Sequence, residues 1–202
     1  MDWGHRMRDR YPELESAESK VQEAYDILRD AFRSHKKLLV CGNGGSAADA
    51  EHIVGELMKG FHKQRPLGEE ERRLYGEVGG YLQGALPAIA LTGSIALTTA
   101  FQNDVHPKMA FAQQVYGYGN SGDVLLAIST SGNSENILYA ADTARSKHMK
   151  VIGLTGRDGG KLKEKCDCCI IVPGMSTAEI QEYHLPVYHT ICAMLEETFF
   201  RR

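Results

Sequence analysis

The stretch that decides the fold runs from Lys37 to Glu56 and reads KLLVCGNGGSAADAEHIVGE. It begins as an apolar run, continues as a glycine turn and ends in a pattern that predicts a helix. A second polar turn, from Ser129 to Ser134, also follows an apolar run and precedes a predicted helix. Two such strand–turn–helix units are typical of α/β proteins that bind ligands where their strands end.

Apolar runs and helical patterns alternate along the chain. The predicted strands cover residues 37–41, 87–91, 123–128, 150–154 and 169–173. The predicted helices cover residues 12–34, 46–59, 95–102, 134–147, 160–165 and 177–199. Continuously apolar strands suit a parallel sheet that is covered on both faces. We therefore predict a single domain over residues 1–202, a doubly wound three-layer α/β/α sandwich around a five-stranded parallel sheet.

Composition narrows the class of protein. The chain has 202 residues, of which 43% are hydrophobic and 24% charged, as in an ordinary globular domain. A net charge of −3 argues against a nucleic-acid partner, which usually requires a basic face. There is no secretory leader pattern and no apolar run long enough to span a membrane, so we expect a cytoplasmic protein.

The five cysteines are an odd number, and a chain of this length does not need disulfides. The run Cys166-Asp167-Cys168-Cys169 raises the alternative of a metal site. It lacks the paired spacing of a zinc site and leads directly into a predicted strand, which favours small buried residues at the start of that strand.

Residues 62–86 interrupt the alternation, and they form a long connection for a compact domain. The charged run at residues 69–73 predicts an extra helix over about 68–83, lying on the sheet edge or on a neighbouring subunit. A solvated surface excursion is the alternative.

The turn from Ser129 to Ser134 has the composition of a phosphate site. Ser129, Thr130, Ser131 and Ser134 supply four hydroxyls next to a helix N-terminus, whose free N–H groups favour an anion. It is not a P-loop, so a nucleoside triphosphate is not indicated. The alternative is that Ser134 only caps the helix.

The glycine turn allows a ligand to approach the backbone closely, and Asn43 offers an amide to sugar hydroxyls. Ser46 and Asp49 resemble a capping box. His52 and Glu56 are four residues apart and share one face of the helix. They are either an exposed pair, or two zinc ligands, or a ligand and a base.

The last predicted helix is rich in polar groups, and Pro186 is expected to kink it. Spacing alone would pair Glu182 with His189. Gln181 and His189 point about 80° apart on an ideal helix. Periodicity therefore does not choose a partner for His189.

Together these motifs resemble the SIS-domain (sugar isomerase) family, and within it the phosphoheptose isomerases, over residues 20–200. The segments that carry the resemblance are CGNGGSAADAEH, RPL followed by LPAIALT, QND, GDVLLAISTSGNS, VIGLTGRDGG and IQEYHLPVYH. The chain departs from the family in a longer insertion at 67–85, in Lys59-Gly60 and in Glu179.

The resemblance implies a flavodoxin-like order of strands, a homotetramer and one zinc ion per subunit, together with roles for particular residues. The implied zinc ligands are His52, Glu56, Gln181 and His189. The implied contacts to the sugar are Asn43, Gly44, Gly45, Asn103 and Asp104, with Glu56 and Gln181 also at the substrate. The implied phosphate contacts are Ser129, Thr130, Ser131 and Ser134.

The function that follows is the interconversion of sedoheptulose 7-phosphate and D-glycero-manno-heptose 7-phosphate. This aldose–ketose isomerisation passes through an enediol and needs a base and an acid, for which Glu56 and His189 are the candidates in either assignment. Two alternatives remain open. One is another phosphosugar isomerase, and the other is a non-catalytic phosphosugar-binding regulator similar to the replication-initiation branch of the family.

Overall fold

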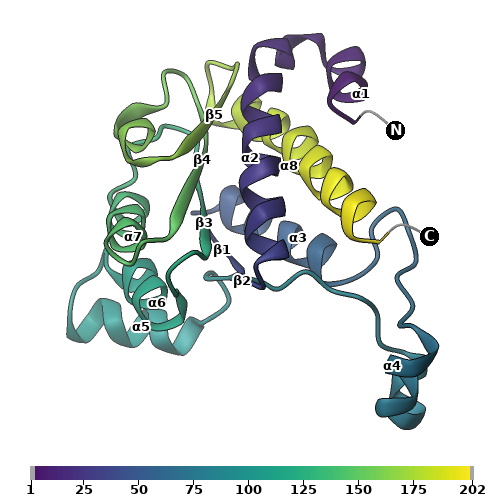
Figure 1. Ribbon diagram of the computed structural model, residues 1–202. Helices are drawn as coiled ribbons and strands as arrows, with labels where there is room; N and C mark the ends of the chain where they lie inside the picture. Colours follow the sequence, from purple (N-terminus) through teal and green to yellow (C-terminus); the bar gives the residue numbers. More distant parts are fainter. Residues whose placement is uncertain (1–2, 201–202) are drawn as a thin grey trace.

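The computed structural model describes residues 3–200, and its centre is a five-stranded parallel sheet (Figure 1). The strands are β1 (Leu38–Cys41), β2 (Ala88–Ala90), β3 (Val124–Ser129), β4 (Lys150–Gly156) and β5 (Cys168–Val172). Their order is β2-β1-β3-β4-β5, and every neighbouring pair is parallel. This is the flavodoxin-like order, so the predicted sheet is confirmed.

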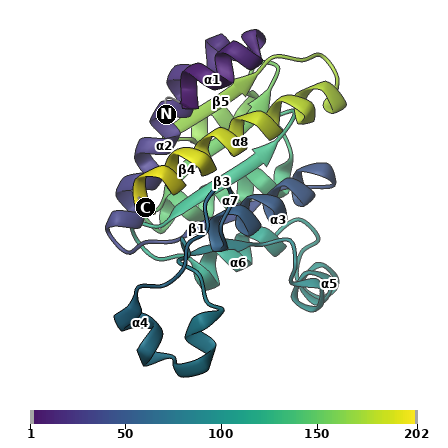
Figure 2. The same ribbon diagram turned by 90° about the vertical axis from the view of Figure 1, so that its right-hand side faces the viewer.

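Helices cover both faces of the sheet. One face packs against α2 (Glu18–Arg33), α3 (Gly45–Met58) and α8 (Thr177–Phe199), with α8 lying between the other two in Figure 2. The other face packs against α6 (Ala110–Tyr118) and α7 (Glu135–Ser146). Within β1, Leu38 and Val40 join the first core, whereas Leu39 and Cys41 join the second. Successive side chains of a strand point to opposite faces, so one apolar run serves both cores.

Two helices escaped prediction. Helix α1 (Trp3–Arg10) ends where Tyr11 precedes Pro12, because a residue before proline disfavours the helical region. The predicted helix 12–34 is consequently wrong at its start, where residues Pro12–Ala17 form a separate 3-10 helix before α2. Helix α6 was not predicted, because its apolar stripe is weak and it contains Gly117.

The remaining helices agree with prediction within two residues. Helix α5 (Ile95–Asp104) and the 3-10 helix Gly160–Lys165 lie where expected, and α8 continues through Pro186. Among residues 3–200, no helix is both long enough and apolar enough to cross a bilayer. All five cysteines are free, and Cys168 is a buried residue at the start of β5.

Residues 62–86 form an arm that projects from the body of the molecule, with α4 (Glu69–Leu74) near its tip (Figures 1 and 2). The predicted single helix over 68–83 is wrong. Gly76 adopts a left-handed φ of +58° and separates α4 from the 3-10 helix Gly76–Gly80. Leu74 and Tyr81 are each 81% exposed, so no core forms within the arm.

A buried ion pair holds the base of this arm. Arg65 Nε donates to Glu196 Oε1 at 2.8 Å, and both side chains are buried. The Glu196 carboxylate also accepts the backbone N–H groups of residues 61, 62 and 63. The other guanidinium nitrogens of Arg65 donate to the carbonyls of Glu56 and Leu57, which closes the end of α3. One pair therefore joins α3, the arm and α8.

We predict that Arg65→Met lowers the free energy of unfolding by about 3–5 kcal/mol, because it leaves the Glu196 carboxylate buried without its cation. Chemical denaturation measures the change. Arg73→Met is the matched control, because Arg73 lies in the same arm but is 81% exposed. Equal losses in the two variants would contradict the role of the pair.

His184 is the second unusual group in the core. It is fully buried on α8, and neither ring nitrogen has a hydrogen-bond partner among the described residues. Burial lowers the pKa of His184 to about 4, because the charged imidazolium would lose its hydration. His184 is therefore neutral in the folded protein near neutral pH.

From this we predict a loss of stability in acid. Between pH 6.5 and pH 4 the unfolded chain binds a proton at His184 and the folded chain does not, so the free energy of unfolding falls as the pH falls through this window. Denaturation at pH 7 and pH 4.5 should show a smaller difference for His184→Leu than for the unsubstituted protein. His106→Gln, at an exposed histidine, should not reduce the difference.

Candidate active site

The site is built by two helices that run side by side, α3 and α8. At their first turns Gly45 lies against Gln181, where a Cβ on Gly45 would come within 2.6 Å of the Gln181 amide nitrogen. Two turns further on, His52 meets Tyr188 and His189. Seven residues of helix span about 10 Å, so the two ends of this contact are separated by that distance.

Three of the predicted functional side chains converge at the second contact. His52 Nε2 lies 3.1 Å from Glu56 Oε1 and 3.4 Å from His189 Nε2. His52 and Glu56 come from α3, as their spacing predicts, and His189 comes from α8. A carboxylate from one helix and an imidazole from the other thus face the same nitrogen.

Tyr188 and Asp49 set the orientation of His52. The Tyr188 hydroxyl donates its proton to Asp49 Oδ1 at 3.3 Å, and it also lies 3.0 Å from His52 Nδ1. The proton of the second hydrogen bond therefore belongs to Nδ1 of His52. Nε2 of His52 then faces the Glu56 carboxylate and the His189 ring nitrogen. Carboxylate and imidazole can each accept a proton, so this cluster joins three groups that can take part in proton transfer.

The surroundings favour uncharged forms of the polar groups. Burial, followed by the neighbouring His52, lowers the pKa of His189. Burial raises the pKa of Tyr188, so its hydroxyl stays protonated, and burial also raises the pKa of Asp49. Glu56 Oε2 is buried without a hydrogen bond, and Lys59 Nζ lies 3.6 Å from it. Lys59 thus places a cation beside the carboxylate.

The predicted zinc ligands do not form one coordination sphere in this arrangement. Gln181 lies at Gly45, about 10 Å along the helices from His52. Within residues 3–200, no three His, Cys, Asp or Glu side chains are placed to hold a metal ion together. The donor types suit zinc, but their positions do not fit it as they stand, so the zinc site stays a prediction.

The glycine turn faces a cavity of about 230 Å³. Asn43 exchanges two amide hydrogen bonds with Asn136, at 2.8 and 3.0 Å, so its amide is held against α7. Gly42 and Gly44 line the cavity, as does Lys108, which pairs with Glu135. The cavity therefore combines backbone groups, amides and a cation next to the turn that precedes α7.

The turn from Ser129 to Ser134 lies where β3 ends and α7 begins. Ser134 occupies the N-cap position, but its side chain makes no capping hydrogen bond. It accepts instead from the Ser129 hydroxyl at 3.2 Å. The structure therefore does not show Ser134 as a simple helix cap. The N-cap side chain of α7 makes no capping hydrogen bond, which suits a site for an anion.

The other predicted residues are not brought into this cluster. Asn103 and Asp104 end α5, are exposed, and hydrogen-bond to each other at 2.8 Å. The capping box predicted at Ser46 and Asp49 is wrong, because Gly44 is the N-cap of α3 and Asp49 accepts from Tyr188. A capping box does form at the start of α8, where Glu179 pairs with Ser176, and this explains an acidic residue at that position.

Comparison with known proteins agrees with this geometry. The SIS domain family matches residues 2–78 and 71–156. A phosphoheptose isomerase of Nitratiruptor is 42% identical over 89% of this chain and 86% of its own length, and one from Rhodospirillum rubrum is 41% identical over 88% and 85%. The chain belongs to the phosphoheptose isomerase family of SIS-domain proteins.

Solved structures of the family have the same fold. The phosphoheptose isomerase of Francisella tularensis is 34% identical, superposes with a TM-score of 0.80, and the match covers 93% of this chain and 91% of that one. The Neisseria gonorrhoeae protein, also 34% identical, gives 0.76 over 96% and 93%. The likeness extends over nearly the whole chain, so it includes both helices of the candidate site.

Sequence reasoning missed Tyr188, Asn136 and Lys108. Tyr188 neighbours the predicted His189, but no spacing rule links it to a histidine 136 residues earlier. Asn136 carried a weak signal, as an amide in the first turn after the phosphate turn. Contacts between distant segments of the chain leave no periodic trace in the sequence.

We predict that Tyr188→Phe changes the tautomer of His52, because the substitution removes the oxygen that accepts from Nδ1. Nitrogen NMR of the ring should show the proton of His52 on Nδ1 in the unsubstituted protein and substantially on Nε2 in the variant. Tyr25→Phe, which removes a hydroxyl bonded to Thr198 far from His52, is the control. An unchanged tautomer in Tyr188→Phe would refute the orientation described above.

Proposed function

We propose that this protein interconverts sedoheptulose 7-phosphate and D-glycero-manno-heptose 7-phosphate. The observation that carries the proposal is the approach of Glu56 and His189 to a single nitrogen of His52, from two different helices. The names of relatives about 40% identical support the class of reaction. The exact sugar rests on those names and on the chemistry of the site.

The reaction moves a proton between the first two carbons of the sugar. One group removes the proton from C1 of the ketose, and with a proton taken up by O2 this gives the enediol. The proton on O1 is then lost and the other group returns a proton to C2, which forms the aldose. The neutral imidazole of His189 and the carboxylate of Glu56 can each accept a proton, and either assignment is compatible with the geometry. His52 lies between them and can pass a proton from one to the other, which resets the pair after turnover.

The phosphate has a separate role. We assign phosphate binding to the turn from Ser129 to Ser134, where hydroxyls and a helix N-terminus can hold an anion. Asn43 hydrogen-bonds to Asn136, two residues after this turn, and we assign the contacts with the sugar chain to Asn43, Gly44 and Gly45. Binding energy from the phosphate end then fixes which two carbons reach Glu56 and His189.

Assembly and zinc belong to the same proposal. Helix α5 buries none of its residues, and Ile95 and Val105 are 74% and 66% exposed, which supports a homotetramer that covers it. Asn103 and Asp104 would then face the sugar bound by a neighbouring subunit. Light scattering tests the assembly, and metal analysis tests for one zinc ion per chain. No step above passes through the metal.

We predict that Glu56→Gln and His189→Gln each lower kcat/KM for sedoheptulose 7-phosphate roughly 100- to 10,000-fold, because each removes one proton-transfer group. Circular dichroism should show both variants folded. Glu182→Gln is the matched control, because Glu182 is an exposed carboxylate on the same helix as His189, and its activity should be unchanged.

The alternatives give different results. A related phosphosugar isomerase would turn over another sugar phosphate faster and would still need both groups. A non-catalytic regulator would bind sugar phosphates without turnover, and Glu56→Gln would leave that binding intact. Full activity in either of the two catalytic variants would refute the proposed mechanism.

A further inference from the structure

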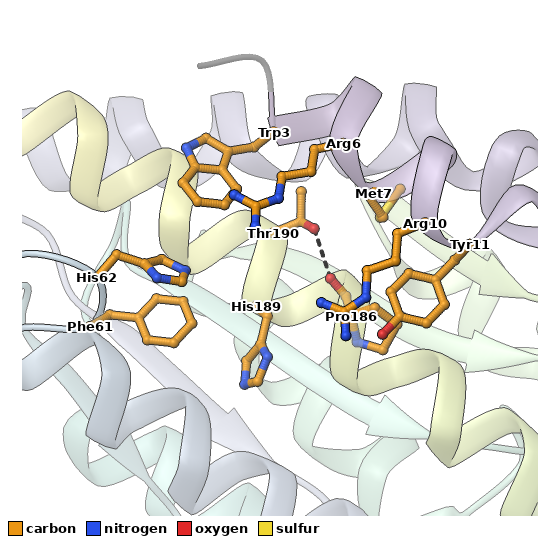
Figure 3. Close-up of a pocket in the computed structure, with 10 residues that line it drawn as sticks. All are labelled: Trp3, Arg6, Met7, Arg10, Tyr11, Phe61, His62, Pro186, His189 and Thr190. Atoms are coloured by element: carbon orange, nitrogen blue, oxygen red, sulfur yellow. Dashed lines mark hydrogen bonds between the residues drawn. The ribbon is translucent and has the colours of Figure 1, made fainter.

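A second cavity lies on the other side of His189, between α1 and α8, and it has no part in the function proposed above. Its volume is about 130 Å³. The residues that matter in it are Trp3, Arg6, Arg10, Phe61, His62 and His189 (Figure 3). About 10–15 Å³ on this measure is enough for a water molecule, so the cavity has room for a small polyatomic ion.

One wall is a stack of rings held firmly in place. Trp3 stacks on His62 with ring centres 5.0 Å apart and an angle of 18° between the rings. Phe61 lies 4.0 Å from His62 and 5.2 Å from His189. The backbone N–H groups of Phe61 and His62 both donate to the buried Glu196 carboxylate at 2.8 Å. The wall is therefore preorganised by the ion pair at the base of the arm.

The charge of the cavity has a single sign. Arg6 and Arg10 reach from α1 toward α8, and they line the cavity together with His189 (Figure 3). None of the described residues that line the cavity carries a carboxylate. Arg10 stacks over the Tyr11 ring at 5.4 Å and makes no ion pair with residues 3–200. Guanidinium groups on aromatic rings, beside two imidazoles, are suited to an oxyanion.

We propose that this cavity binds a phosphate group, held by Arg10 and adjacent to the His189 imidazole. The site is distinct from the turn at residues 129–134, and its existence does not rest on the proposed isomerase reaction. The phosphate is either that of a bound sugar phosphate or free inorganic phosphate. In both cases the anion would lie beside the ring of His189, which also lines the cavity.

The protein contains a probe for this site alone. Trp3 is its only tryptophan, and it lines the cavity, whereas the turn at residues 129–134 contains none. Inorganic phosphate is titrated at constant ionic strength, with chloride as the replaced anion, and the tryptophan fluorescence is followed. We expect a saturable change that chloride alone does not produce.

Variants of α1 give the decisive comparison. Arg10→Met should weaken phosphate binding at least tenfold, and Arg10→Lys should weaken it less because the positive charge is kept. Arg8→Met is the matched control, because Arg8 is on the same helix but pairs with Glu18 at 3.3 Å and does not line the cavity. Its phosphate affinity should equal that of the unsubstituted protein.

The source of the phosphate follows from competition. If sedoheptulose 7-phosphate displaces inorganic phosphate from the Trp3 site and the unphosphorylated sugar does not, the site receives the phosphate of the sugar. If the phosphate signal persists at saturating sugar phosphate, the site belongs to free phosphate. Both results support the site. No saturable signal, or equal affinity in Arg10→Met and Arg8→Met, would overturn it, whether or not the protein turns over a sugar.

Discussion

The packing of α3 against α8 is the contact on which the site depends. The two helices leave the same edge of the sheet, so they run side by side, and residues at equal depth meet in pairs. Gly45 is small enough to admit Gln181 at the sheet edge, and His52 meets Tyr188 and His189 two turns deeper. Any shift of one helix along the other would separate Glu56 from His189, because both positions are set by the same register.

The buried pair of Arg65 and Glu196 protects that register. It ties the last carbonyls of α3 to α8 and holds residues 61–63 beside His189. The arm begins at this point and projects away, so it leaves the packing of α3 against α8 undisturbed. The same pair holds the aromatic wall of the cavity between α1 and α8. The candidate active site and the proposed phosphate site therefore have a common support.

Local patterns in the sequence were enough to predict the sheet and half of the candidate site. Continuous apolar runs and glycine turns predicted five parallel strands, and a spacing of four placed His52 and Glu56 on one face. The partner of His189 could not be predicted from the sequence. Spacing within α8 favoured Glu182, whereas in the structure His189 contacts His52, which is 137 residues away in the chain. Tyr188, and the role of Asp49 as its hydrogen-bond acceptor, were missed for the same reason. The length of the helix in the arm was predicted wrongly. The charged run at residues 69–73 indicated a helix, but the left-handed Gly76 separates it from the next segment.

The most direct test of the central claim, that Glu56 and His189 act as one unit, is a double-substitution cycle on kcat/KM. Residues that serve the same proton transfer are not additive. The account predicts that the protein carrying both Glu56→Gln and His189→Gln is about as impaired as the worse single variant. Losses that multiply would mean that the two groups work independently, and they would contradict the account.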